Sequence, residues 1–117
     1  MTNGTASHPN SKTYTPERLN VIRQQETEQA ISILNLKQEI KRIALNIQDG
    51  QVFEKKDHLK HLLASHLKAD DILITTFEHD GHPDHEGTGQ VALELAHEKG
   101  LAIYRVLIWA WHWAKPK

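Results

Sequence analysis

Apolar residues recur along the chain with two alternating spacings. Helical spacing predicts three helices, over residues 16–34, 54–68 and 83–99. Short apolar runs bounded by turn residues predict three strands, over residues 40–47, 71–76 and 101–108. Strands that alternate with helices of this length are typical of an α/β fold with parallel strands. Local signals agree: Thr15-Pro16-Glu17 is typical of a helix start, Asp49-Gly50 of a turn, and Gly100 of a helix end.

Composition narrows the class of protein. The 117 residues are enough for one modest domain, and 14 basic residues nearly balance 15 acidic ones. No basic face points to nucleic acid or to an anionic membrane, and no apolar run of about 18 residues predicts a membrane span. The polar N-terminus lacks the apolar segment of a signal peptide, so a cytoplasmic location is expected. With no cysteine, any metal must be held by His, Asp or Glu.

The stretch Asp80-Gly81-His82-Pro83-Asp84-His85 carries the clearest candidate chemistry. It lies where the predicted strand 71–76 ends and the helix from Pro83 begins, and ligand sites of α/β sheets collect at the carboxyl ends of strands. Residues at i and i+3 share one face of a helical turn, so His82 and His85 are expected to face a common cleft. Imidazole is the commonest protein metal ligand, and a nearby carboxylate can fix its orientation.

Other histidines have the same spacing without the same context. His58 and His61 fall off the apolar stripe of their predicted helix, and we interpret them as exposed side chains that bind nothing. His66 falls within that stripe and is expected to be a partly buried, hydrogen-bonded histidine.

Two further features admit both a structural and a functional interpretation. Arg23 and Glu26 project onto the apolar stripe of helix 16–34, either as an internal ion pair or with Arg23 reaching a site. Trp109, Trp111, His112 and Trp113 cluster after the last strand, either as plain core or as the wall of a pocket where a sugar ring stacks. In the second interpretation Asp49, His82, His85 and His112 lie at one sheet edge.

These residues in this order resemble the PIG-L/LmbE family. The resemblance spans essentially the whole chain. It rests on the His-Pro-Asp-His motif with Thr88-Gly89, the Pro16-Glu17-Arg18…Arg23…Glu26 helix, the Gln48-Asp49-Gly50 turn, Ala6-Ser7-His8-Pro9 and Trp111-His112-Trp113-Ala114. Members of the family are zinc-dependent de-N-acetylases of N-acetylglucosamine-type substrates. The implied fold is a Rossmann-like, three-layer α/β/α arrangement with a mostly parallel sheet.

The resemblance also implies roles for individual residues. His85 matches the histidine that binds Zn²⁺, and His82 matches the histidine that stabilises the tetrahedral oxyanion, supported by Asp84. Asp49, Arg23 and, through the aromatic cluster, His112 are candidate substrate contacts. Catalytic zinc keeps three protein ligands and one open position, lowers the pKa of its bound water and polarises the amide carbonyl.

One part of the family pattern is missing. Family members begin with a strand that ends in His-Pro-Asp-Asp-Glu, which supplies two zinc ligands and the general base. Here His8-Pro9-Asn10-Ser11 follows no strand and lacks those carboxylates. We therefore expect one partial domain over residues 1–117, truncated at both ends, with exposed sheet edges that favour a homo-oligomer or a complementing chain.

Two functions from different classes follow. The chain is either part of a zinc-dependent deacetylase or a non-catalytic remnant that completes another chain. A nucleotide-binding module is disfavoured because no glycine-rich phosphate loop follows any strand.

Overall fold

The computed structural model describes residues 2–34 and 40–115, and the chain divides into two compact units, residues 1–49 and 50–117. The first unit contains α1 (Pro16–Leu34). The second contains α2 (Lys56–Ala64), β1 (Ile72–Thr76), α3 (Pro83–Lys99), β2 (Ala102–Val106) and the short 3₁₀ helix η1 (Ala110–His112). The single domain expected over the whole chain stays a prediction.

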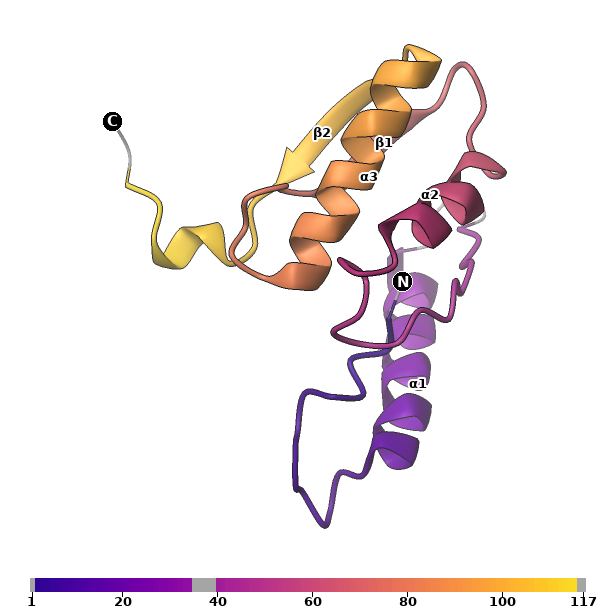
Figure 1. Cartoon of the computed structure of the whole chain (residues 1–117). Helices are drawn as coiled ribbons and strands as arrows, with labels where there is room; N and C mark the ends of the chain where they lie inside the picture. The colour runs from indigo at the N-terminus through magenta and orange to yellow at the C-terminus, as the bar shows by residue number, and fades with distance from the viewer. Residues whose placement is uncertain (1, 35–39, 116–117) are drawn as a thin grey trace. The chain divides into compact units, whose positions relative to one another are not determined.

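The second unit is built on a β–α–β arrangement. Strands β1 and β2 pair in parallel, from Ile72 opposite Ala102 to Thr76 opposite Val106, and α3 connects them. Figure 1 shows α3 lying along this strand pair, with α2 beside α3. The α/β class and the parallel pairing predicted from the sequence are confirmed.

The two faces of the strand pair differ. Successive side chains on a strand point to opposite faces. Leu73 and Ile103 are half-buried, whereas Ile72, Ile74 and Tyr104 are more than 60% exposed. Within residues 50–115 the packed helix therefore covers one face of the sheet, and the three-layer arrangement stays a prediction.

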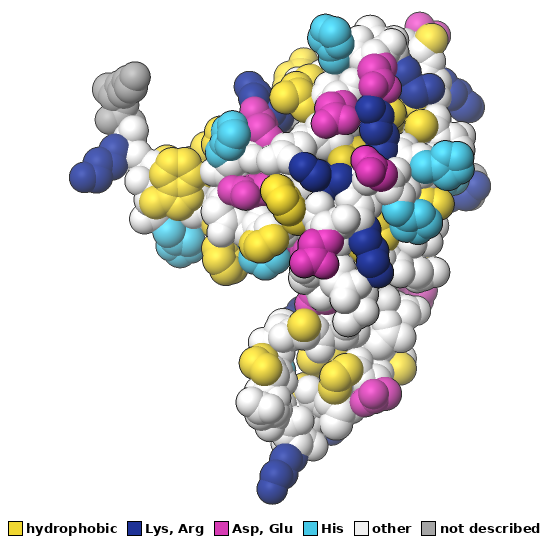
Figure 2. Space-filling view, in the orientation of Figure 1, with side chains coloured by type: hydrophobic (Ala, Val, Ile, Leu, Met, Phe, Trp, Pro, Cys, Tyr) yellow, Lys and Arg dark blue, Asp and Glu magenta, His cyan; other side chains and the backbone are white. Residues whose placement is uncertain are grey.

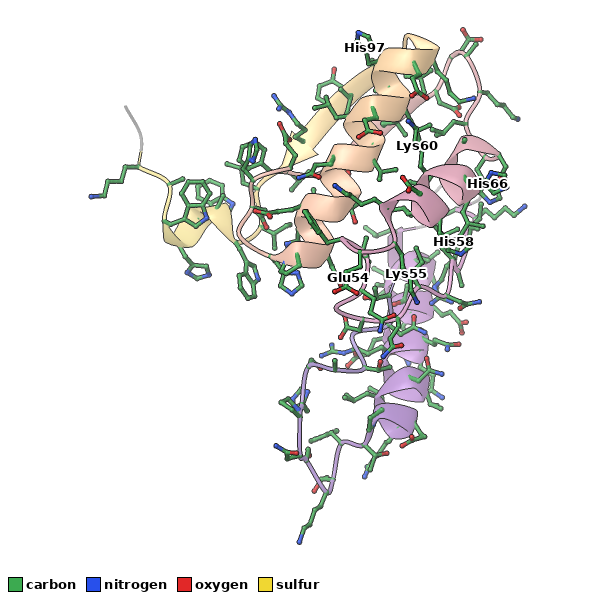
Figure 3. The ribbon with its side chains drawn as sticks, in the orientation of Figure 1. Glu54, Lys55, His58, Lys60, His66 and His97 are labelled. Carbon is green, nitrogen blue, oxygen red and sulfur yellow. The ribbon has the colours of Figure 1, made fainter. Side chains whose placement is uncertain are left out.

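The core of the second unit is formed by apolar residues of α2, α3 and the loop before α2. Leu59, Val91, Leu95 and Val52 are at most 1% exposed. Around them the helices are joined at the surface, where the Lys60 ammonium of α2 contacts the carboxylates of Glu94 and Glu98 on α3 (Figure 3). Figure 2 shows acidic and basic side chains interspersed on the visible face of this unit.

Two glycines of α3 allow the helix to approach backbone closely. A Cβ on Gly89 would lie 2.5 Å from the Thr76 carbonyl oxygen at the end of β1. A Cβ on Gly87 would lie 2.8 Å from the Cα of Phe53, in the loop before α2. The first two turns of α3 are therefore held between the strand end and this loop, and that contact positions the histidine motif.

In the first unit, α1 confirms the predicted helix 16–34. Its cap is also as expected, because the Thr15 hydroxyl accepts the N–H of Arg18 at 3.3 Å. Leu19 is buried, as is Ile47 near the end of the unit. Among the described residues of the chain, no helix combines the length and hydrophobicity needed to cross a membrane.

The predicted strand 40–47 is wrong. These residues have no regular secondary structure, Ile40 and Ile43 are each 43% exposed, and Asn46 has a φ of 54°, outside the extended region. An apolar run becomes a strand only where a neighbouring strand pairs with its backbone groups. Residues 40–49, as described, pair with none.

The predicted helix 54–68 is correct in type but too long, since α2 ends at Ala64. The Ser65 hydroxyl donates to the Leu62 carbonyl at 2.7 Å, an alternative to continuing the helix. The expectation for His66 is wrong as a result, because this residue lies beyond the helix and is exposed. His58 is exposed, as predicted (Figure 3).

Candidate functional site

The candidate site begins at the turn between β1 and α3. Gly81 has a φ of 89°, which turns the chain, and His82 is the N-cap of α3 with Pro83 in its first turn. The His82 Nδ1 atom accepts the backbone N–H of Asp84 at 3.2 Å. An imidazole nitrogen is thus the N-cap hydrogen-bond acceptor, a role usually taken by a serine, threonine, aspartate or asparagine oxygen.

His82 and His85 lie side by side at this helix start, as their spacing predicts. Their ring centroids are 4.5 Å apart, and both side chains are half-buried. The end of β1 holds the same turn, because the Thr76 hydroxyl donates to the His85 carbonyl at 2.8 Å. Sequence pattern and tertiary packing therefore agree on this pair.

Asp80 begins the histidine motif, but sequence analysis gave it no role of its own. Its carboxylate is completely buried and lies 2.6 Å from the His85 Nδ1 atom. The same carboxylate accepts backbone N–H groups of Ile108, Trp109 and Ala110 at 2.9–3.0 Å. The only signal in the sequence was an acidic residue five positions before His85, and its partners at 108–110 could not be read from that spacing.

These contacts determine the charge of Asp80. Burial raises the pKa of its carboxyl, but the N–H groups of Trp109 and Ala110, then His85 and the N–H of Ile108, lower it more. The net pKa lies well below the usual range for aspartate, so the buried group is a carboxylate at neutral pH.

The Asp84 carboxylate is hydrogen-bonded to the loop before α2. It accepts the N–H groups of Gly50 and Val52 at 2.8 and 3.0 Å and so ties the loop before α2 to the start of α3. Its link to His82 runs through its own backbone N–H. The contact that the structure shows between the two residues is thus a backbone contact, and the expected role of Asp84 in supporting His82 stays a prediction.

The tryptophan segment lies beside the histidines. The Trp109 ring meets the His82 ring edge to face, with centroids 4.8 Å apart. Trp109, Trp111 and Trp113 are 49%, 77% and 55% exposed, so they are not plain core, whereas Ala110 between them is buried. His112 is exposed in η1. Of the three indoles, Trp109 is the one that contacts the His82 ring.

Two predicted site residues belong to the first unit. The Asp49 carboxylate accepts the Ala6 N–H at 2.9 Å and the Thr2 hydroxyl at 3.1 Å, which ties down the N-terminal loop. Arg23 forms the predicted internal pair, with its guanidinium 3.1 Å from the Glu26 carboxylate, and also lines a hollow of about 450 Å³ that Arg42 shares. The expected grouping of Asp49 with the histidines at one sheet edge stays a prediction.

Within the part of the chain that the structure describes, the donors do not make a complete zinc site. Catalytic zinc needs three protein ligands. Among the described residues, no group of three or more His, Asp or Glu side chains could hold a metal ion. His85 is a candidate for one ligand.

Comparison with known proteins agrees with the motif. The family described as PIG-L, GlcNAc-PI de-N-acetylase, matches residues 1–96, which include the whole His-Pro-Asp-His turn and nearly all of α3. No curated protein and no solved structure gives a significant match. On the extent of the family match, the chain belongs to the PIG-L family.

Proposed function

We propose that this chain provides the His-Pro-Asp-His part of a zinc-dependent hydrolase site that removes acetyl groups from N-acetylglucosamine-type substrates. The observation that supports it is the side-by-side placement of His82 and His85 at a strand-to-helix turn, in a chain of this family. The substrate class follows the family description and the half-exposed Trp109 indole beside His82.

His82 is proposed as the group that stabilises the oxyanion. Its Nδ1 atom accepts the Asp84 N–H, so in a neutral ring the proton lies on Nε2. Nε2 is then a hydrogen-bond donor. A preorganised donor aimed at a developing oxyanion contributes about 3–4 kcal/mol of transition-state stabilisation in comparable enzymes.

His85 is proposed as one nitrogen ligand of Zn²⁺. One histidine is too little for catalytic zinc, and the described residues contain no group of three or more His, Asp or Glu side chains that could hold a metal ion. The chain alone is expected to bind zinc weakly and to hydrolyse amides negligibly.

The alternative function is a non-catalytic remnant, or a chain that becomes active by completing another polypeptide. The incomplete ligand set among the described residues favours it. In either case Arg23, Asp49 and His112 are proposed contacts to the N-acetylated amino sugar.

Acetate release from an N-acetylglucosamine-containing substrate tests the proposal. We expect none above background from the chain alone. Turnover should appear after addition of a polypeptide that carries a strand ending in His-Pro-Asp-Asp-Glu, and it should be lost in His82→Ala and His85→Ala. The His58→Ala variant is the matched control, since His58 has the same spacing to His61 and is exposed. Zinc-dependent, His82-dependent hydrolysis by the chain alone would contradict the incomplete site.

Calorimetry with zinc tests the ligand assignment separately. Specific binding should be weak, absent in His85→Ala and unchanged in His58→Ala. Tight one-to-one binding that survives His85→Ala would show that zinc is held elsewhere.

A further inference from the structure

We infer that Asp80 is the positioning residue of this site: its carboxylate sets the tautomer of His85 and holds the Trp109 segment beside His82. The inference deepens the proposed function, and its consequence for catalysis rests on that function. The hydrogen-bond geometry from which the inference is drawn is independent of the proposed function.

The first step is the division of contacts between the two carboxylate oxygens. Oδ1 accepts the N–H groups of Ile108 and Ala110 at 2.9 and 3.0 Å. Oδ2 accepts the N–H of Trp109 at 2.9 Å and lies 2.6 Å from the His85 Nδ1 atom. Asp80 is completely buried, so the four hydrogen-bond partners of its carboxylate are all protein groups shielded from bulk water.

The second step concerns the proton on His85. An ionised carboxylate only accepts hydrogen bonds. The close His85 nitrogen must therefore be the one that carries hydrogen, and in a neutral ring Nε2 keeps its lone pair. A neutral His82 is the other tautomer, with its hydrogen on Nε2, because its Nδ1 atom accepts the Asp84 N–H. Two adjacent imidazoles thus present different atoms: His85 an acceptor or metal ligand, His82 a donor.

The third step concerns the aromatic segment. The three N–H groups that Asp80 accepts belong to consecutive residues, 108–110, at the start of η1. The Asp80 carbonyl also accepts the Trp113 indole N–H at 3.3 Å. One residue therefore fixes both the imidazole tautomer and the backbone that carries Trp109 to within 4.8 Å of the His82 ring centroid.

Asp80→Asn separates positioning from packing, because the shape is kept and one oxygen becomes an NH₂ group. The new amide has two possible orientations. If its oxygen occupies the Oδ1 position, the hydrogen bonds from the Ile108 and Ala110 N–H groups are kept, and the NH₂ group faces the His85 Nδ1 atom and the Trp109 N–H. If its oxygen occupies the Oδ2 position, the N–H groups of Ile108 and Ala110 face the NH₂ group and lose their acceptor. The first orientation leaves fewer N–H groups unpaired, so His85 Nδ1 should become an acceptor and its proton should move to Nε2.

Long-range ¹H–¹⁵N NMR of the metal-free chain, at a pH where the imidazoles are neutral, reads the tautomer directly. His85→Gln assigns the resonances. We expect His85 to be predominantly Nδ1–H in the wild-type chain and predominantly Nε2–H in Asp80→Asn. The matched control is Glu78→Gln, which neutralises another buried carboxylate of the same loop, one paired with Arg105. It should leave the His85 tautomer unchanged.

The outcomes distinguish this inference from the proposed function. A wild-type His85 that is predominantly Nε2–H overturns it, and this measurement remains decisive if Asp80→Asn does not fold. An unchanged tautomer in a folded Asp80→Asn chain also overturns it. The expected tautomers in a chain that never supports deacetylation would uphold Asp80 as a positioning residue and contradict the proposed function alone.

Discussion

Replacement of Gly89 by alanine tests whether α3 is held by close backbone packing. In an exposed helix, Gly→Ala is stabilising by about 1 kcal/mol because alanine has the higher helix propensity. At Gly89 the new Cβ would lie 2.5 Å from the Thr76 carbonyl oxygen and 2.8 Å from the Glu78 nitrogen, where ordinary contact begins at 3.4 Å. The atoms in the way are backbone, so α3 and the end of β1 must move apart by nearly 1 Å.

The magnitude follows from these opposing effects. Overpacking of a core costs about 1–3 kcal/mol, and a clash with backbone on both sides belongs at the upper end. After subtraction of the propensity gain, Gly89→Ala should lower the free energy of unfolding by about 2 kcal/mol. For a unit of this size that corresponds to a melting temperature lower by roughly 8–16 °C.

Urea and thermal unfolding followed by circular dichroism measure this change. Gly100→Ala is the matched control: its φ is 67° and nothing lies within 4 Å of the added Cβ, so only left-handed backbone strain of about 1–2 kcal/mol is expected. NMR spectra of Gly89→Ala should also show shifted His82 and His85 resonances, whereas Gly100→Ala should leave them in place. A Gly89→Ala chain that is more stable than wild type would refute the close packing of α3 on β1.

Three other predictions concern the second unit. Leu95→Ala should lower the free energy of unfolding in urea by about 2–5 kcal/mol, because Leu95 is 1% exposed. Ile74→Ala should lower it by less than about 0.5 kcal/mol, because Ile74 is 73% exposed. Equal effects of the two substitutions would contradict the one-sided packing of the sheet. Asp84→Asn leaves either the partly buried N–H of Gly50 or the buried N–H of Val52 without its carboxylate oxygen. We expect a loss of about 1–3 kcal/mol in the free energy of unfolding and faster exchange of the Gly50 and Val52 amides, and unchanged exchange would show that these hydrogen bonds are unimportant. The pKa of Asp80 is lowered by folding, so the native state binds fewer protons than the unfolded chain, and stability should be full above about pH 4 and fall as the pH drops below it. Urea midpoints at about pH 7 and pH 3 should therefore differ less in Asp80→Asn than in the wild-type chain, and an equal difference would argue against this role.

Much of the second unit could be predicted because its signals are local. The apolar run that becomes β1, the Pro83 start and Gly100 end of α3, and the spacing of His82 and His85 all depend on neighbours within a few residues. The family match over residues 1–96 agrees with the motif from which the resemblance was inferred. Local backbone preference and side-chain spacing are properties of the sequence itself.

Pairing and burial were decided by tertiary structure. Residues 40–47 have the composition of a strand but no paired neighbour among the described residues, so composition alone did not make one. The tryptophans could have been core or surface, and packing leaves their rings exposed while Ala110 is buried.

The clearest difference concerns the carboxylates of the histidine motif. The family resemblance implied that Asp84 supports His82, but in the folded chain the Asp84 carboxylate accepts the N–H groups of Gly50 and Val52. The Asp80 carboxylate is hydrogen-bonded by residues 108–110, which reach it only after α3 and β2 have brought the chain back. Hydrogen bonds between residues about 30 positions apart depend on the path of the whole chain, and a local pattern carries no information about that path.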